Sequence, residues 1–470
     1  EQTWGFNFRR YHPREVFRRI SIHPFDRNNS CRLCQHSELV GFVDVDPGRS
    51  LEITPTLVGT RSSEMDEDEF PDGKLAAEDP DLDPGLFVSW GMTPNMNLSG
   101  TINPDFSQVE ADVAQLDINQ QFALFFPELR PFFLEGASFF DTRIRAVHTR
   151  NLADPNWGVK LTGQEGKNGI GVLAVEDAQT NLLLPGPEGS DVETIEDESL
   201  AGIVRYRRDV GQASSIGVLF TGREADDYSN VVGGVDGKLR LTENDTLQFQ
   251  YLRSQTEYPL EFGEEFEQPE GSFDDDAIHF SLFHNTRNWE LGTFYRDIGA
   301  DFRADLGFLR RVDSRFLGVR GGYNWYGDED DWYTRIEVGG GWDRGRRESG
   351  DLIDEETEFR VRILGSKWQS NLSFGGALEK QVYEGTLFDD MVTTWIAGSI
   401  RPRASVAMGL EVSQADAIDF SDVRPGEQLR VSPFLLLNPG RHMQANIFHT
   451  FRSLDVEGGT LFEANLTELR

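Results

Sequence analysis

Apolar and polar residues alternate one by one in many short stretches of this chain. Phe359, Val361 and Ile363, for example, alternate with Arg360 and Arg362. The same period of two recurs over 246–251, 278–282, 404–413 and 461–467. Alternation of this kind is typical of β-strands that bury an apolar face on one side and expose a polar face on the other. The pattern predicts an all-β protein.

Further strands are predicted along nearly the whole chain, and the segments between them fall into two length classes. Strands are expected near 38–45, 50–60, 86–93, 96–103, 156–163, 168–176, 200–208, 214–223, 231–241, 288–296, 314–326, 331–342, 368–379, 391–400, 426–437 and 441–451. Some connections are short, such as 165–167, and others are long and acidic: 61–84, 178–198, 256–275 and 344–356. Short turns at one end and long loops at the other indicate an antiparallel transmembrane β-barrel, here of about 20 strands.

The charges on these strands are compatible with a lipid-facing exterior. An Arg or Lys that points into lipid at mid-bilayer costs about 2–4 kcal/mol. Lys238, Arg240, Arg360 and Arg362 all alternate with apolar neighbours, so they can all point into the barrel. A soluble β-sandwich would show the same alternation, but it would have less reason to sort its connections by length.

Residues 101–141 interrupt the alternation and are predicted to form a plug inside the barrel. The stretch 104–141 contains eight Phe and two prolines on either side of Glu128, Leu129 and Arg130. A segment this apolar cannot remain a loop in water. We expect Asp105, Glu110, Arg130 and Glu135 to anchor it, with Glu128 in a buried Arg–carboxylate contact. In a soluble protein the segment would instead be a buried core segment between sheets.

Composition and charge narrow the functional classes. The 470 residues include 45 Lys and Arg and 80 Asp and Glu, a net charge of −35. This argues against sequence-independent nucleic-acid binding and against docking on anionic lipid through a basic face, both of which need a surplus of basic residues. No run of 18 apolar residues predicts a membrane-spanning helix. Because the sequence starts abruptly at Glu1, we expect it to begin inside a larger precursor.

The 101–140 sequence, TINPDFSQVEADVAQLDINQQFALFFPELRPFFLEGASFF, resembles the signature of a bacterial family of unknown function, domain of unknown function 5916. The segments 4–11, 156–163 and 302–313 also match the family pattern. Members look like outer-membrane β-barrels and often carry an N-terminal carbohydrate-binding-like domain of the family-nine type. The resemblance therefore implies a Gram-negative outer-membrane barrel with 101–141 as an internal element, but it implies no reaction.

The resulting division of the chain has three parts: an N-terminal segment with the first barrel strands (1–100), the plug-like segment (101–141) and the remaining strands (142–470). The carbohydrate-binding-like domain of the family is not recognisable here. The chain also ends at Arg470 within an alternating stretch. An outer-membrane barrel usually ends in a strand with a terminal aromatic residue, so closing strands are expected beyond it.

Cys31 and Cys34 are the two cysteines of the chain. Three positions apart in an exported protein, they most simply form a local disulfide. A c-type haem site would need C-x-x-C-H, and Gln35 intervenes before His36. A zinc site with His23 and His36 remains an alternative. No cofactor is predicted, although acidic loops such as 64–69 could collect Ca²⁺ adventitiously.

No sequence motif indicates an enzyme. The carboxylate pairs Glu110/Asp112 and Glu128/Glu135 could serve glycoside cleavage, but contacts that fix the plug explain them better. The predicted function is a passive outer-membrane channel for a small solute or glycan fragment, with Arg360 and Arg362 facing the solute. The alternatives are a scaffold that holds a protein partner at its long loops and a soluble glycan-acting enzyme.

Overall fold

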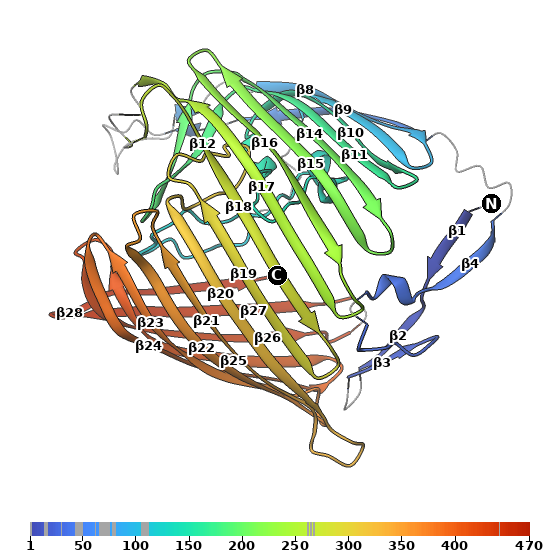
Figure 1. Ribbon diagram of the computed structural model, residues 1–470, viewed down its shortest axis with the longest axis vertical. Helices are drawn as coiled ribbons and strands as arrows, with labels where there is room; N and C mark the ends of the chain where they lie inside the picture. Colours follow the sequence, from blue (N-terminus) through green and yellow to red (C-terminus); the bar gives the residue numbers. More distant parts are fainter. Residues whose placement is uncertain are drawn as a thin grey trace.

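Twenty antiparallel strands form one closed barrel in the computed structural model (Figure 1). The structure describes residues 2–13, 17–29, 31–42, 50–61, 63–64, 76–77, 81–104, 112–260, 263, 266, 268–440 and 442–470. The barrel strands are β5 (Leu51–Thr60), β8 (Asp81–Thr93), β9 (Met96–Ile102), β10 (Pro155–Glu165), β11 (Asn168–Asp177), β14 (Ser199–Val210), β15 (Ser214–Ala225), β16 (Tyr228–Arg240), β17 (Asp245–Glu257), β18 (Ser272–Asn285), β19 (Trp289–Ile298), β20 (Ser314–Tyr326), β21 (Tyr333–Arg346), β22 (Leu352–Gly365), β23 (Asn371–Tyr383), β24 (Thr386–Arg403), β25 (Val406–Asp419), β26 (Arg424–Leu437), β27 (Ala445–Val456) and β28 (Gly459–Leu469). The barrel closes between β28 and β5. The predicted fold class is confirmed.

The remaining elements are short. Four small two-stranded sheets pair β1 (Gln2–Phe6) with β4 (Ser37–Phe42), β2 (Arg9–Pro13) with β3 (Phe17–Ser21), β6 (Ser63–Glu64) with β7 (Ala76–Ala77), and β12 (Thr180–Pro185) with β13 (Ser190–Ile195). The strand predicted near 38–45 is thus β4, which lies outside the barrel. The helices whose bounds the structure describes are α1 (Pro131–Leu134) and three 3₁₀ turns at Leu33–Gln35, Ala137–Phe139 and Thr149–Asn151. Within the described residues, no helix has the length and apolar character needed to cross a membrane.

The two ends of the barrel differ in their connections. At one end, which we call the short-turn end, the hairpins close in a few residues, as at 166–167 and 404–405. At the other, the long-loop end, lie the connections 103–154, 178–198 and 299–313. The long-loop end also carries tight turns, such as 226–227 between β15 and β16. The N-terminal strands β1–β4 lie beyond the short-turn end (Figure 1).

The outer face of the barrel is apolar, as the alternation predicts. On β15 and β16, Val218, Phe220, Val231 and Val235 point outward and are between 38% and 50% exposed. On β22, Phe359 is 57% exposed on the same outer face. Its neighbours on the chain, Arg360 and Glu358, lie on the inner face and line a cavity within the barrel. The period-two pattern therefore separates an apolar exterior from a charged interior.

Strand β28 departs from this rule. Its register against β27 shifts between Leu454 and Asp455, where a bulge inserts an extra residue. Ala464 then pairs with Arg452, whose guanidinium reaches the carbonyl of Ile118 inside the barrel. Directly paired residues of neighbouring strands share a face, so Ala464 points inward with Arg452 and Glu463 points outward. The sequence alternation alone would have placed them the other way round.

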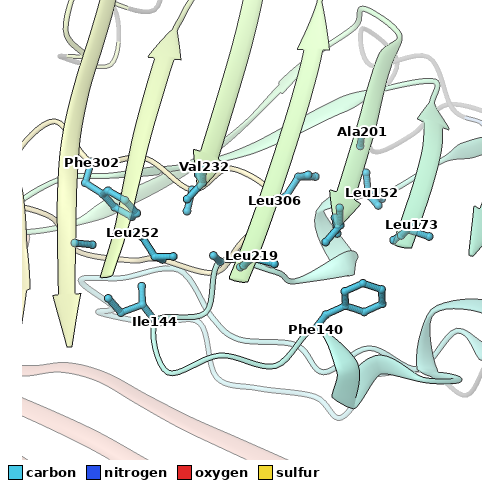
Figure 2. Close-up of a cluster of buried hydrophobic side chains, with 14 of the residues drawn as sticks. Phe140, Ile144, Leu152, Leu173, Ala201, Leu219, Val232, Leu252, Phe302 and Leu306 are labelled. Carbon is cyan, nitrogen blue, oxygen red and sulfur yellow. The ribbon is translucent and has the colours of Figure 1, made fainter. Parts of the chain in front are cut away.

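The main hydrophobic core lies inside the barrel rather than between two sheets. Inward side chains of β11 and β14–β18 pack against residues from the 103–154 and 299–313 connections (Figure 2). Phe140, Ile144 and Leu152 come from the first connection, and Phe302 and Leu306 come from the second. These two connections therefore fill the space beside one wall of the lumen, and both arrive there from the long-loop end.

Candidate functional site

The connection between β9 and β10 enters the lumen, and aromatic rings fix it to the wall. Phe132 and Phe140 pack on β10 and β11 at positions occupied by glycine. A Cβ on Gly158 would lie 2.9 Å from Phe132 Cε1, and one on Gly171 would lie 2.8 Å from Phe140 Cε1. The two glycines thus leave the room that the rings occupy. We call the described part of this connection, residues 112–154, the plug.

An internal ion pair holds the plug in shape. Arg130 is 5% exposed, and its guanidinium donates to both carboxylate oxygens of Glu128 at 2.7 and 2.9 Å. The same group donates to the carbonyls of Leu152 and Thr149, at 2.6 Å each. Burial raises the pKa of the Glu128 carboxyl, but the hydrogen bonds and charge of Arg130, together with the Thr149 hydroxyl, outweigh it and hold the pKa below its usual value. Glu128 therefore stays ionised, and its pair with Arg130 ties the middle of the plug to its C-terminal end.

The connection between β19 and β20, residues 299–313, forms a second luminal layer over the plug. The His148 amide donates to the Leu306 carbonyl at 2.6 Å, and the Asn151 side chain donates to the Asp305 carbonyl at 2.7 Å. The Asp305 carboxylate accepts from the hydroxyls of Tyr228 and Tyr258, at 2.8 and 3.0 Å. Burial raises the pKa of Asp305 above its usual value. Residues 302–313 match the family pattern in the sequence, but they were not predicted to lie in the lumen.

His148 lies between two aromatic rings at the junction of these layers. Its ring centroid is 5.1 Å from that of Phe125 and 5.3 Å from that of Phe308. Burial, followed by the positive charge of Arg145, lowers the pKa of His148 to about 4. Arg150 and Arg130 act in the same direction, and Glu128 opposes them. The imidazole is therefore neutral at ordinary pH.

The other predicted anchors have different surroundings. Asp105 and Glu110 lie outside the described residues. The Glu135 carboxylate accepts from the Asn97 amide of β9 at 2.9 Å. Lys160 of β10 donates to the main-chain carbonyls of Phe132 and Glu135. The plug is thus bonded to the wall through main-chain groups as well as through the predicted carboxylates.

The wall from β19 to β22 carries charged side chains that face the interior. A cavity of about 430 Å³ is lined by Arg320, Arg335, Arg360, Glu337 and Glu358, among others. Arg320 lies 3.7 Å from Glu358, and Arg335 lies 2.6 Å from Glu337. Of the two predicted solute-facing residues, Arg360 is an exposed side chain of this cavity, whereas Arg362 does not line it. Arg362 donates to Asn371 at 2.9 Å.

Cys31 and Cys34 are joined by a disulfide at the short-turn end. The loop that contains them contacts three barrel turns. Asn29 accepts from Arg240 at 2.7 Å, Asn28 accepts from the Arg287 amide at 3.0 Å, and Arg27 stacks on the ring of Tyr326 at 4.5 Å. This loop attaches the N-terminal strands to the barrel rim. Within the described residues, no group of three or more His, Cys, Asp or Glu could hold a metal ion.

Four arginines that the sequence analysis did not single out surround a second cavity, between the plug and the 299–313 connection. They are Arg145, Arg296, Arg310 and Arg311. One signal was available: Arg310 and Arg311 are adjacent within the family-like segment 302–313 of a strongly acidic chain. The other two come from distant positions, and only the fold brings them to the same place.

Comparisons with known proteins return several solved bacterial structures at low similarity and one family. Pseudomonas aeruginosa OccK7 (OpdD) aligns with 10% identity and a TM-score of 0.40 over 90% of this chain and 98% of that chain. Acinetobacter baumannii OccAB3 aligns with 9% identity and a TM-score of 0.38 over the same shares. Pseudomonas aeruginosa OpdQ aligns with 9% identity and a TM-score of 0.39 over 90% of this chain and 100% of that chain. No curated protein matches the sequence. Residues 60–145, which include the 101–140 signature, match the family described as Domain of unknown function (DUF5916), and this confirms the predicted family resemblance.

Proposed function

We propose that this protein is an outer-membrane channel that admits a small solute past an internal plug. The observation that carries the proposal is the reversal of polarity across the barrel wall. Outward positions such as Phe220 and Phe359 are exposed and apolar, whereas inward positions such as Arg320 and Arg360 are charged. A closed barrel with apolar residues outside and polar residues inside suits lipid on one side and water on the other.

The plug packs on one side of the lumen, and this position supports passage of a solute along the other side. The plug core packs against β11 and β14–β18. On the opposite wall, Arg360 remains exposed inside the barrel, in a cavity of about 430 Å³. A solute would move along this second wall, where fixed arginines and carboxylates select it by size and charge without an energy source. The solute, including the glycan fragment considered from the sequence, and the bacterial outer membrane as the location are parts of this proposal.

Planar-bilayer recording of the purified full chain tests the proposal. We expect discrete channel openings in KCl. Replacing residues 112–151 with a glycine–serine linker of equal length should raise the unit conductance severalfold, because the packed aromatic segment is removed from the lumen. A linker of the same design in place of the exposed turn 329–331, at the short-turn end, is the control and should leave conductance unchanged. Absence of current from both the native chain and the plug variant would refute a channel and favour a scaffold.

A further inference from the structure

A cavity of about 420 Å³ lies at the surface of the plug, near the long-loop end of the lumen. Its lining comes from four parts of the chain: the plug, the end of β19, the 299–313 connection and the start of β20. We call it the arginine chamber. Its charged residues are Arg145, Arg296, Arg310 and Arg311, and its aromatic residues are Phe122, Phe125, Phe308 and Phe316.

Among the residues that the structure describes, the arginine chamber carries more arginines than paired carboxylates. Arg311 pairs with Asp354 at 3.2 Å. Arg145, Arg296 and Arg310 have no carboxylate within 4.0 Å among the residues the structure describes, and all three side chains are exposed. Asp343, on the neighbouring strand, lies 3.9 Å from Arg320. A chain with a net charge of −35 thus gathers three cations inside its barrel that have no carboxylate partner within its described part.

Each of these guanidinium groups lies over at least one phenylalanine ring. The Cζ of Arg145 lies 4.3 Å from the ring centre of Phe125, and that of Arg296 lies 5.4 Å from Phe316. Arg310 lies 5.9 Å from the ring centres of Phe122 and Phe308.

A stacked guanidinium keeps its N–H donors at its edge, where they can bind a carboxylate in a bidentate way. Arg311 adds a further donor, because its buried Nε has no hydrogen-bond partner within the described part of the chain.

We propose that the arginine chamber binds a small organic anion, with its carboxylate on the unpaired guanidinium groups and its apolar body against the phenylalanine rings. The proposal rests on the channel function above and deepens it by naming the class of solute. The volume suits a small molecule, since ligand pockets commonly measure about 300–1,000 Å³. The four rings give the anion an apolar contact that an inorganic ion such as chloride cannot use.

The chamber also has a definite place along the path. Ile298, the last residue of β19, and Ser314, the first of β20, both line it, so it lies toward the long-loop end. Arg320 and Arg360 lie farther along the same wall toward the short-turn end and line the second cavity. A solute that enters from the long-loop end meets the chamber first and then a series of further arginines. Repulsion by the acidic loops is screened within about 10 Å at 0.1 M salt.

Benzoate is the probe for the experiment, because it joins one carboxylate to an apolar ring, and benzamide is its neutral counterpart. The chamber variant is R145Q/R296Q/R310Q. The control variant, R253Q/R315Q/R344Q, removes three outward-facing arginines that pair with carboxylates outside the lumen. Both variants change the net charge equally. Binding of each probe to the purified protein in detergent is measured by titration calorimetry, and block of the KCl current is measured in planar bilayers.

We expect benzoate to bind the native protein and the control variant with equal affinity, within twofold, and the chamber variant at least tenfold more weakly. Benzamide should bind none of them detectably. Equal benzoate binding to the native protein and the chamber variant, or equal binding of benzamide and benzoate, would overturn the proposal. The two readouts separate the claims: current without benzoate binding leaves the channel standing and removes the site, whereas benzoate binding without current leaves the site standing and removes the channel.

Discussion

Replacing Arg130 by methionine should loosen the internal structure of the plug while leaving the barrel itself intact. The arginine side chain is 5% exposed and bonds to the Glu128 carboxylate and to the carbonyls of Leu152 and Thr149. Methionine fills a similar volume but supplies no donor, so the buried carboxylate loses its partner. Breaking a buried ion pair from one side costs about 3–5 kcal/mol. At about 1.4 kcal/mol per factor of ten, the population with a locally opened plug should rise at least a hundredfold.

Hydrogen exchange of the full chain measures this effect directly. The amides of Phe133 and Leu134 donate to the Arg130 carbonyl, so they report whether the first turn of the plug is formed. In Arg130→Met their exchange should accelerate by about a hundredfold, the factor expected for roughly 3 kcal/mol. Amides of β17 and β18, which are bonded in the barrel ladder, should keep the protection they have in the native protein.

The double variant Glu128→Met, Arg130→Met is the matched control. It removes both charges, so no unpaired ion remains, and its cost should be well below the sum of the two single substitutions. Unchanged exchange at Phe133 in Arg130→Met would refute the reasoning, as would additivity of the two substitutions. Equal acceleration in the plug and in β17 would also refute it, because the ion pair would then stabilise the whole barrel rather than the plug.

Three further predictions test other parts of the structure. The folded-state pKa of His148 is about 4, below its ordinary value, so the docked plug should be fully stable above pH 6.5 and lose up to about 3 kcal/mol as the pH falls from 6.5 to 4. The loss should be abolished in His148→Phe. Hydrogen exchange of the plug at pH 7 and 5 checks this, and a pH-independent native plug would contradict it. Leu378→Arg on the outer face should lower the free energy of unfolding, measured with urea in lipid vesicles, by about 2–4 kcal/mol. Ala377→Arg on the inner face should change it almost not at all. Equal losses would show that the two faces are misassigned. Removing the disulfide with Cys31→Ser and Cys34→Ser should destabilise its loop by about 2 kcal/mol, seen as faster hydrogen exchange in the loop with unchanged protection of the barrel amides. Slow exchange in the loop of this variant would argue against the prediction.

The sequence predicted the barrel because strand patterning is a local property. Alternation such as Phe359–Arg360–Val361 appears within five residues and needs no knowledge of distant partners. The approximate strand number and the sorting of connections by length followed from the same patterns. The plug was predicted because a segment with eight Phe and no period of two fits neither a strand nor a solvated loop. Each of these features can be read from neighbouring residues alone.

The lumen could not be predicted to the same depth. Arg145, Arg296 and Arg310 belong to three separate segments, and nothing in their local sequences indicates that they share a cavity. The second luminal layer, 299–313, reads as an ordinary connection until Asp305 is found between Tyr228 and Tyr258. Charge counts pointed away from a cationic site, because the surplus of carboxylates over the whole chain hides a local surplus of arginine.

By itself, then, the sequence determined the strands, their apolar and polar sides and the presence of an internal segment, since these depend on the spacing of residues along the chain. The tertiary structure decided which side chains meet inside the cylinder, since closing the sheet brings β19 and β20 next to a plug that left the wall between β9 and β10. It also decided the orientation of β28, where the pairing of Ala464 with the inward-facing Arg452 set an inner face that the alternation had not assigned. A strand pattern fixes two sides, and only pairing with its neighbours determines which of them is the inside.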